Sequence, residues 1–381
     1  MTYFYGQPPR RTGRASIAGY FLSAVAGGII GALLMAYLVP GVIAQRMGWS
    51  RELPRFQFPD LPPVTTTAAD YPVVMVAETL GPAVVGVVNR AVVGQDFRGR
   101  QLLETRTGSG VLISSNGYII TNHHVIANTS QLTVIMADGS SFSAEIVGSD
   151  PPVDLAVIKI PVDHVPYARL GDSDALRVGE PAIAIGNPLG LEFRHSVTAG
   201  VISGIDRILQ VGEEFIRLVQ TDAVINPGNS GGPLANSSGE VIGINTLKID
   251  LPRVEGMGFA IPSNTVRRIV EELISDGRVR RPWLGVKILD RATIQQYRIE
   301  VRVQFDRGVY VDAVVTGSPA ARAGLSVGDI IVEIGKRRVD DIGSLQVALR
   351  EHRVGETVAV KIIRNGQTQT VEITLGEVPS S

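Results

Sequence analysis

The chain has 381 residues, more than one ordinary domain needs, so two folded units with additional segments are expected. A formal net charge of −1 gives no reason to expect nucleic-acid binding. The absence of cysteine excludes a thiol nucleophile and disulfide bonds, and none of the five histidines forms a His-Glu-x-x-His motif, so we expect no metal and no cofactor.

An uncharged, mostly apolar stretch near the N-terminus is long enough to cross a bilayer. Residues 16–39 are predicted to form a transmembrane helix, since about 20 residues rising about 1.5 Å each span the hydrocarbon core. Residues 1–15 would be the tail before it, and Pro40 with Gly41 would end the span. A cleaved signal peptide is the alternative, because Val-Ile-Ala at 42–44 fits a small-residue cleavage pattern.

Residues 40–70 are predicted to be a Pro-rich linker. The prolines of this segment include Pro54, Pro59, Pro62 and Pro63, and no helical or strand period runs through it. Such a composition favours a semi-extended spacer between the apolar segment and the folded domains.

Short apolar runs rich in Val and Ile alternate with turn residues between residues 71 and 262. Many short strands separated by turns indicate a mostly-β barrel or sandwich. The clearest helical period in this part of the chain covers residues 264–274, with apolar side chains at Val266, Ile269, Val270, Leu273 and Ile274. We interpret that segment as the helix closing a domain over residues 71–278.

The most informative motif is Asn-Pro-Gly-Asn-Ser-Gly-Gly-Pro at residues 226–233. A serine flanked by glycines, here Ser230, can lie on a tight turn that brings a nucleophile and converging backbone N–H groups together. Upstream, Thr-Asn-His-His-Val at 121–125 offers a general base and Asp-Leu-Ala-Val at 154–157 a carboxylate to orient it. The order His, Asp, Ser is that of the chymotrypsin type, which predicts a serine endopeptidase.

With Ala-Ile-Gly-Asn-Pro at 184–188, these motifs resemble the HtrA (Deg) family of bacterial envelope proteases over about residues 71–375. The resemblance implies a chymotrypsin-like double β-barrel, each barrel with six strands, followed by a PDZ domain. It also implies an N-terminus in the cytoplasm, a protease domain outside the membrane, and a homotrimer assembled through about residues 71–78.

The resemblance assigns roles to the motif residues. Ser230 would be the nucleophile, Asp154 the orienting carboxylate, and His124 the base, since the family's catalytic histidine directly precedes Val. That pattern selects His124 over the adjacent His123, which would lie exposed or along the cleft wall. We treat His164, His195 and His352 as structural.

Backbone N–H groups of Gly228 and Ser230, with Asn229, are expected to form the oxyanion hole. Chymotrypsin-type zymogens carry Asp where this chain has the neutral Asn229. Activation by propeptide cleavage is therefore not expected, and ordering of the oxyanion loop is the expected control.

By resemblance, Ile225, Lys248 and Ile249 would line the primary specificity pocket. No Asp stands there to receive Arg or Lys, which favours small or medium aliphatic residues of the substrate. Lys248 departs from the apolar residue that some family members have, and the sequence leaves open whether it points away or narrows the choice.

Residues 281–378 resemble a PDZ domain of α+β class. Its markers are Trp-Leu-Gly-Val at 283–286 and Gly-Ser-Pro-Ala at 317–320, with a groove-walling helix at 344–352. The loop of Trp283, Leu284, Gly285 and Val286 would bind the C-terminal carboxylate of a peptide. The alternative is that Trp283 and Leu284 merely pack a domain interface.

Arg207 lies where the family has a sensor-loop arginine that links PDZ occupancy to the oxyanion loop. A solvated surface arginine is the alternative.

These features together predict a membrane-anchored, ATP-independent serine endopeptidase of envelope protein quality control or stress signalling. Its partners would be unfolded or signalling protein substrates, C-terminal peptides at the PDZ domain, and the membrane. A chaperone or peptide-binding scaffold with little proteolysis is the alternative from another functional class, and a secreted soluble protease is a variant of the first.

Overall fold

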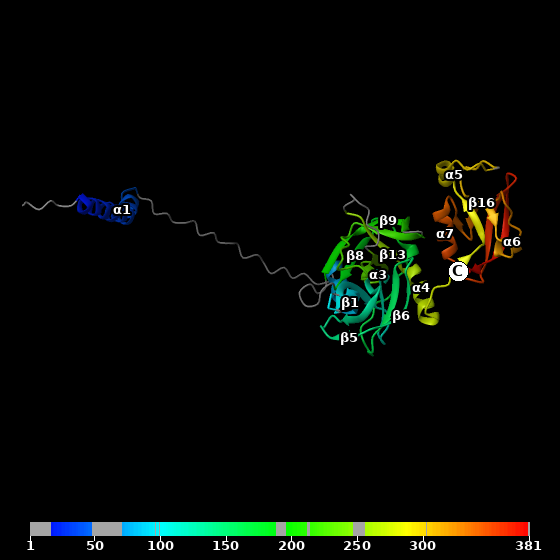
Figure 1. Cartoon of the computed structure of the whole chain (residues 1–381), viewed down its shortest axis with the longest axis horizontal. Coiled ribbons are helices and arrows are strands. Elements are labelled where there is room, and N and C mark those ends of the chain that lie inside the picture. The colour runs from blue at the N-terminus through cyan, green and yellow to red at the C-terminus, as the bar shows by residue number, and fades with distance from the viewer. Residues whose placement is uncertain are drawn as a thin grey trace, which may run out of the picture. The chain divides into compact units, whose positions relative to one another are not determined.

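The computed structural model describes residues 17–47, 71–95, 97–98, 100–187, 196–211, 214–246, 256–301 and 303–379. The chain divides into two compact units, residues 1–65 and 66–381. The first contains helix α1 (Ile17–Met47), drawn in blue in Figure 1. Within α1, the 19 residues Tyr20–Leu38 are apolar enough and long enough to cross a membrane, a test that a signal sequence also passes.

Helix α1 continues beyond the expected end at Pro40 and Gly41. Residues 40–47 therefore belong to the helix rather than to the linker. Proline removes one N–H from the helical ladder, which bends a helix without necessarily ending it when helix-compatible residues follow. The remainder of the expected linker, residues 48–70, lies outside the described residues.

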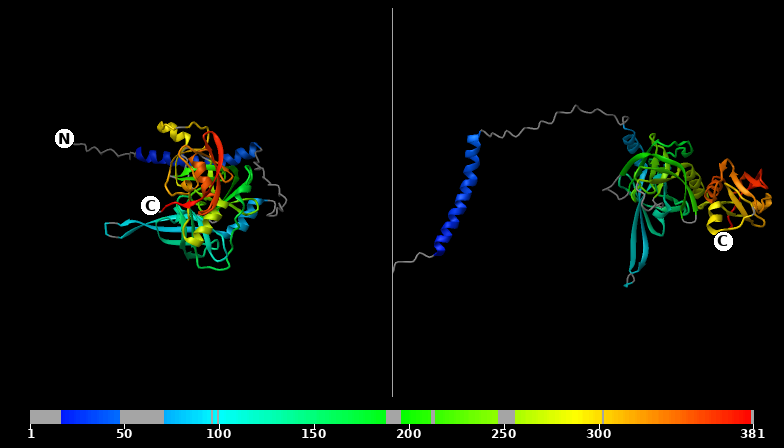
Figure 2. Two further views of the ribbon diagram at one scale, coloured as in Figure 1. Left: turned by 90° about the vertical axis from the view of Figure 1, so that its right-hand side faces the viewer. Right: turned by 90° about the horizontal axis from the view of Figure 1, so that it is seen from above.

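The second unit begins with α2 (Pro72–Leu80) and a first barrel. Its described strands are, along the chain, β1 (Val84–Gln95), β2 (Gln101–Leu112), β3 (Tyr118–Thr121), β4 (Thr129–Ile135), β5 (Ser141–Ser143), β6 (Glu145–Asp150) and β7 (Leu155–Lys159). In the sheet they lie in the order β5-β4-β1-β2-β3-β7-β6. Only Ala144 separates β5, which pairs with β4, from β6, which pairs with β7. The edge strands β5 and β6 are thus two halves of one bent strand that joins the two ends of the sheet. Counted in this way, the first barrel has the six strands expected. Figure 2 shows β1 and β2 extending as a long hairpin.

The second barrel is closed, in the order β10-β13-β12-β11-β8-β9. Its described strands are β8 (Pro181–Gly186), β9 (Ser196–Val211), β10 (Glu214–Thr221), β11 (Pro233–Ala235), β12 (Val241–Thr246) and β13 (Gly258–Pro262). Every residue of β12 and β13 is buried, in agreement with their apolar sequences. The expected double barrel is confirmed.

Helix α4 (Ser263–Asp276) closes the protease domain where the apolar period predicted a helix. Val266, Ile269, Val270 and Leu273 are buried, and Gly277 ends the helix with a left-handed φ of 70°. Ile274 differs from the expectation, since it is 40% exposed. At about 100° per residue it lies at the edge of the apolar stripe.

The C-terminal domain has its own apolar core and a sheet in the order β15-β16-β17-β19-β20. Its helices are α5 (Arg291–Tyr297), α6 (Pro319–Arg322) and α7 (Ile342–Arg350), and its strands are β14 (Pro282–Trp283), β15 (Val286–Leu289), β16 (Val309–Val314), β17 (Ile330–Ile334), β18 (Arg337–Arg338), β19 (Thr357–Arg364), β20 (Gln367–Thr374) and β21 (Gly376–Glu377). Helix α7 begins two residues before the expected helix because Asp341 forms a capping box with Ser344.

Candidate active site

Three polar side chains from separate elements form one line between the barrels. Ser230 lies in the loop between β10 and β11, and its Oγ is 3.2 Å from Nε2 of His124. His124 lies on the short helix α3 (His123–Ile126), and its Nδ1 is 2.8 Å from Oδ2 of Asp154, in the turn between β6 and β7. The imidazole in this line belongs to His124 and not to His123.

Asp154 is 1% exposed, and its carboxylate accepts three hydrogen bonds. Besides the His124 ring, it accepts from the backbone N–H of His124 at 3.0 Å and from Oγ1 of Thr246 at 2.8 Å. Three donors fix both carboxylate oxygens, and through them the orientation of the imidazole. The sequence reasoning missed Thr246, although a buried hydroxyl in an apolar strand signals a polar partner.

Asn122 also contacts the Ser230 side chain. Ser230 Oγ donates to Asn122 Oδ1 at 2.8 Å, a shorter distance than the 3.2 Å to His124 Nε2. The Asn122 Nδ2 donates to the Asp154 carbonyl at 2.9 Å, which fixes which end of the amide faces the serine. Because a hydroxyl has one hydrogen, that hydrogen lies on Asn122 in this arrangement and must turn to His124 before catalysis. The sequence motif contained Asn122 but gave it no role.

Asn229 holds the oxyanion loop, defined here as residues 226–231. Its N–H donates to the Asn226 carbonyl at 3.0 Å, its Oδ1 accepts from Asn226 N at 2.9 Å, and its Nδ2 donates to the Val224 carbonyl at 2.9 Å. The Asn229 N–H is therefore already occupied. This differs from the expectation that it contributes to the oxyanion hole, since an i to i+3 turn uses that donor.

The two other expected oxyanion donors are the backbone N–H groups of Gly228 and Ser230. Among the residues that the structure describes, neither the Gly228 N–H nor the Ser230 N–H donates to a protein group. The peptide that carries the Ser230 N–H is fixed through its other end, since the Asn229 carbonyl accepts from Gly232 N at 3.0 Å.

Only part of the expected specificity pocket can be placed. Ile225 is half-buried against the second barrel, and its Cγ1 would lie 2.6 Å from a Cβ built on Gly258. Lys248 and Ile249 lie outside the described residues, as does His195.

The C-terminal domain contains a groove of about 320 Å³. All four expected residues, Trp283, Leu284, Gly285 and Val286, line it. Gly285 has a φ of 82°, and a Cβ there would meet Ser318 Cβ at 2.2 Å, so this loop position requires glycine. The opposite wall is α7, with Leu345, Leu349 and Arg350, and Glu214 of the protease domain also lines the groove.

Arg207 lies on β9, and its Nε donates to the Gln220 side chain at 3.0 Å within the same hairpin. The resemblance to the family gave this residue the sensor position, but other residues of the β9–β10 hairpin contact the C-terminal domain. The Phe215 carbonyl accepts from Arg350 at 2.9 Å, its N–H donates to Gln346 at 3.3 Å, and Glu214 forms an ion pair with Arg350.

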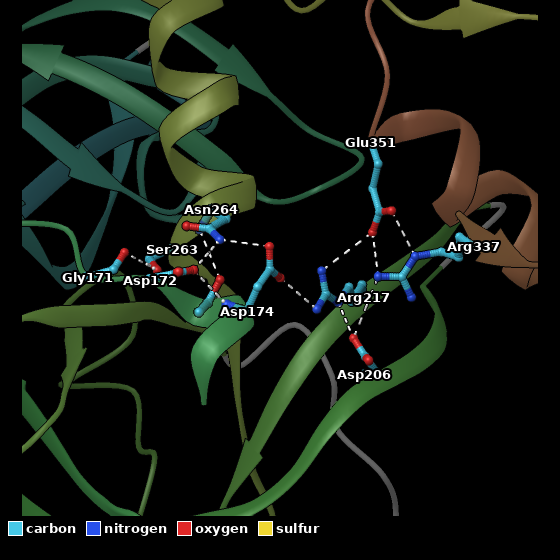
Figure 3. Close-up of polar contacts among 10 residues, drawn as sticks. Gly171, Asp172, Asp174, Asp206, Arg217, Ser263, Asn264, Arg337 and Glu351 are labelled. Carbon is cyan, nitrogen blue, oxygen red and sulfur yellow. Dashed lines mark hydrogen bonds and ion pairs between the residues drawn. The ribbon is translucent and has the colours of Figure 1, made fainter. Parts of the chain in front are cut away.

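Arg217 of β10 joins the protease and C-terminal domains in one ionic network (Figure 3). Its guanidinium contacts Asp206, Asp174 at 2.9 Å and Glu351 at 3.4 Å, and Arg337 holds Glu351 at 2.6 Å. Burial opposes the charge, but the carboxylates of Asp206 and Asp174 outweigh it and raise the pKa of Arg217. The arginine therefore stays charged and holds carboxylates of both domains.

Two domain families match the chain, a trypsin-like peptidase domain at residues 108–244 and a PDZ domain at residues 282–375. Serine protease Do-like HtrA of Bacillus subtilis (strain 168) is 44% identical over 321 residues, covering 79% of this chain and 72% of that protein. Serine protease Do-like HtrB of the same strain is 38% identical over 380 residues, covering 93% of this chain and 82% of that protein.

Solved structures agree with this match. The HtrA-type protease AlgW with a decapeptide superposes with a TM-score of 0.63 at 34% identity, covering 81% of this chain and 99% of that chain. The matched peptidase domain contains His124, Asp154 and Ser230, whose side chains form the line described above. The relatives also match this chain over most of their own length. The chain belongs to the HtrA family of trypsin-like serine proteases.

Proposed function

We propose that this HtrA-family protease is a membrane-anchored endopeptidase of the bacterial envelope that cuts unfolded or signalling proteins without ATP. The observation that carries the proposal is the line from Asp154 to His124 at 2.8 Å and from His124 to Ser230 at 3.2 Å. These distances suit proton transfer between a serine and an oriented imidazole.

Acylation begins when the Ser230 hydroxyl turns from Asn122 to His124. Ser230 Oγ attacks the carbonyl carbon of the scissile peptide bond, and its proton passes to Nε2 of His124. Asp154 stabilises the imidazolium that results. The carbonyl oxygen becomes an oxyanion held by the N–H groups of Gly228 and Ser230, an effect of about 3–4 kcal/mol per donor in other enzymes.

The tetrahedral intermediate then collapses. The C–N bond breaks, His124 gives its proton to the leaving amine nitrogen, and the acyl group stays on Ser230 Oγ as an ester. Water attacks the ester carbon while one of its protons passes to His124. The ester bond then breaks, His124 gives that proton to Ser230 Oγ, and the acyl group leaves as a carboxylic acid. Ile225, Lys248 and Ile249 would line the pocket for the residue before the cleaved bond, with a preference for small or medium aliphatic side chains.

Peptide binding to the PDZ groove is proposed to regulate this activity. The groove is lined by residues 283–286 and by Leu345, Leu349 and Arg350, and Glu214 brings the protease domain to its edge. A bound C-terminal peptide would therefore contact residues of both domains. AlgW has been solved with a decapeptide, and by analogy the β9–β10 hairpin, which carries Arg207, would transmit occupancy to the oxyanion loop.

We also propose that α1 attaches the protein to the membrane and that the protein forms a trimer. The uncharged segment Tyr20–Leu38 supports a span, and related proteins include a periplasmic DegP-like protease. On α2, Val73 and Val74 are 36% and 43% exposed, and Tyr71 before it is 50% exposed. These apolar side chains support association of copies through residues 71–78.

The test uses the detergent-solubilised full chain and unfolded casein, with and without peptides that end in apolar residues. We expect casein cleavage that rises with peptide and disappears in Ser230→Ala, because only the nucleophile has been removed. Suppressed casein aggregation without cleavage under any peptide would replace the protease with a chaperone. Casein cleavage that no peptide changes would support the proposed proteolytic activity and refute its regulation by peptide binding to the PDZ groove.

A further inference from the structure

Ser109, on β2 of the first barrel, contacts the oxyanion loop carried by the second barrel. It is fully buried. Its N–H donates to the Ser230 carbonyl at 2.9 Å, and its Oγ donates to the Gly228 carbonyl at 2.7 Å. One residue thus holds the carbonyl groups of both expected oxyanion donors.

The direction of the Ser109 hydroxyl hydrogen follows from its second partner. The backbone N–H of Asn187, after β8, donates to Ser109 Oγ at 2.7 Å. Since Oγ accepts that bond, its single hydrogen points to the Gly228 carbonyl. The hydroxyl therefore bridges two backbone groups of the second barrel.

The chain around this hydroxyl is closely packed, as two neighbouring glycines show. A Cβ built on Gly108 would lie 2.7 Å from Val125 Cγ2 and 3.2 Å from the Ser230 carbonyl oxygen. A Cβ on Gly232 would lie 2.3 Å from the Ile185 carbonyl and 3.2 Å from Ser109 Cβ. Loss of the hydroxyl would remove the donor to the Gly228 carbonyl and the acceptor of the buried Asn187 N–H.

We propose that Ser109 is a positioning residue for the oxyanion hole, an inference that rests on the proposed function. The peptide between Gly228 and Asn229 is held at both ends, by Ser109 on its carbonyl and by Asn226 on its N–H. This restricts the torsions of Gly228 and hence the direction of its N–H. The N–H of Ser109 restrains Ser230 in the same way, although Ser109 itself does not touch substrate.

Ser109→Ala in the full chain tests the inference, because it removes the hydroxyl and keeps the backbone N–H. We expect kcat with activating peptide to fall about 10- to 100-fold, since misplaced oxyanion donors act on the transition state, with KM almost unchanged. A peptide boronic acid, whose serine adduct places an oxygen in the same hole, should bind more weakly by a similar factor.

Ser263→Ala is the matched control. Ser263 is also fully buried, and its hydroxyl donates to the Gly171 carbonyl at 2.9 Å, away from the triad. Both variants should lower Tm, but only Ser109→Ala should lower kcat and boronate affinity. Equal kcat losses in the two variants, or unchanged kcat in Ser109→Ala, would overturn the inference.

Ser109→Cys replaces the hydroxyl with a thiol, which is a weaker hydrogen-bond donor. It is the variant to measure if Ser109→Ala does not fold. Its kcat and boronate affinity should fall below those of the wild type, and wild-type values for both would overturn the inference. A wild-type protein that neither cleaves casein nor binds the boronate would instead refute the proposed function, so the two failures are distinguishable.

Discussion

Asp154→Asn is expected to lower kcat about 10,000-fold while the protein stays folded. Asp154 accepts from the Nδ1 of His124 at 2.8 Å, from its backbone N–H at 3.0 Å, and from Thr246 Oγ1 at 2.8 Å. An amide offers one acceptor oxygen and would turn its NH₂ toward donors. The ring then carries its proton on Nε2 and cannot accept the proton of Ser230. Steady-state kinetics on casein-derived peptides measure the loss.

Asp290→Asn provides the matched control for that substitution. Asp290 caps α5, and its carboxylate accepts from Thr293 N at 2.8 Å, far along the chain from the triad. We expect near wild-type kcat, since an asparagine still caps a helix. Retention of more than about a tenth of the activity in Asp154→Asn would show that Asp154 does not orient the base.

Gly231→Ala is expected to abolish activity and to lower Tm. Gly231 has a φ of 83°, and its Cβ would lie 2.3 Å from the Ser109 carbonyl oxygen and 2.7 Å from Thr121 Oγ1. The left-handed backbone alone costs an alanine about 1–2 kcal/mol. The clash with a backbone oxygen adds to this and pushes the residue after the nucleophile out of place. Thermal unfolding and casein cleavage measure both effects.

Gly239→Ala separates the backbone strain from the clash. Gly239 has a similar φ of 79°, but the nearest atom to its Cβ is Thr79 Oγ1 at 3.5 Å. This variant should lose only the stability of the left-handed backbone and keep its kcat. If Gly231→Ala were no worse than Gly239→Ala in either measurement, the close packing behind Ser230 would be refuted.

The triad was predictable because its residues lie in short motifs whose order carries the chemistry. His124, Asp154 and Ser230 each belong to a short motif of neighbouring residues, so the sequence alone was enough to identify them. The many short apolar runs indicated only a barrel or sandwich, whereas the resemblance to the family implied the double barrel and the PDZ domain. The structure brings the three side chains together as the motifs predict.

The partners of the triad were not predictable in the same way. Thr246 of β12 binds Asp154, and Ser109 of β2 binds Gly228, each across more than 90 residues of the chain. No local pattern encodes contacts that depend on how two barrels approach each other. Asn122 belonged to a motif, but only the distance of 2.8 Å to Ser230 Oγ shows what it contacts.

The contact between the domains shows a similar limit. Arg207 was selected by its position along the chain, yet Arg217, Glu214 and Phe215 of the same hairpin make the contacts to the C-terminal domain. Hairpin residues alternate between faces, so a small shift in position changes which side chains meet a neighbouring domain.

Mass spectrometry after reaction with a fluorophosphonate tests the central claim most directly. The reagent phosphonylates a serine only where a base removes the hydroxyl proton. We predict one adduct, on the peptide that contains Ser230, with no adduct in Ser230→Ala and little in His124→Ala. An adduct on another residue, or equal labelling of His124→Ala, would contradict the assignment of Ser230 as a nucleophile activated by His124.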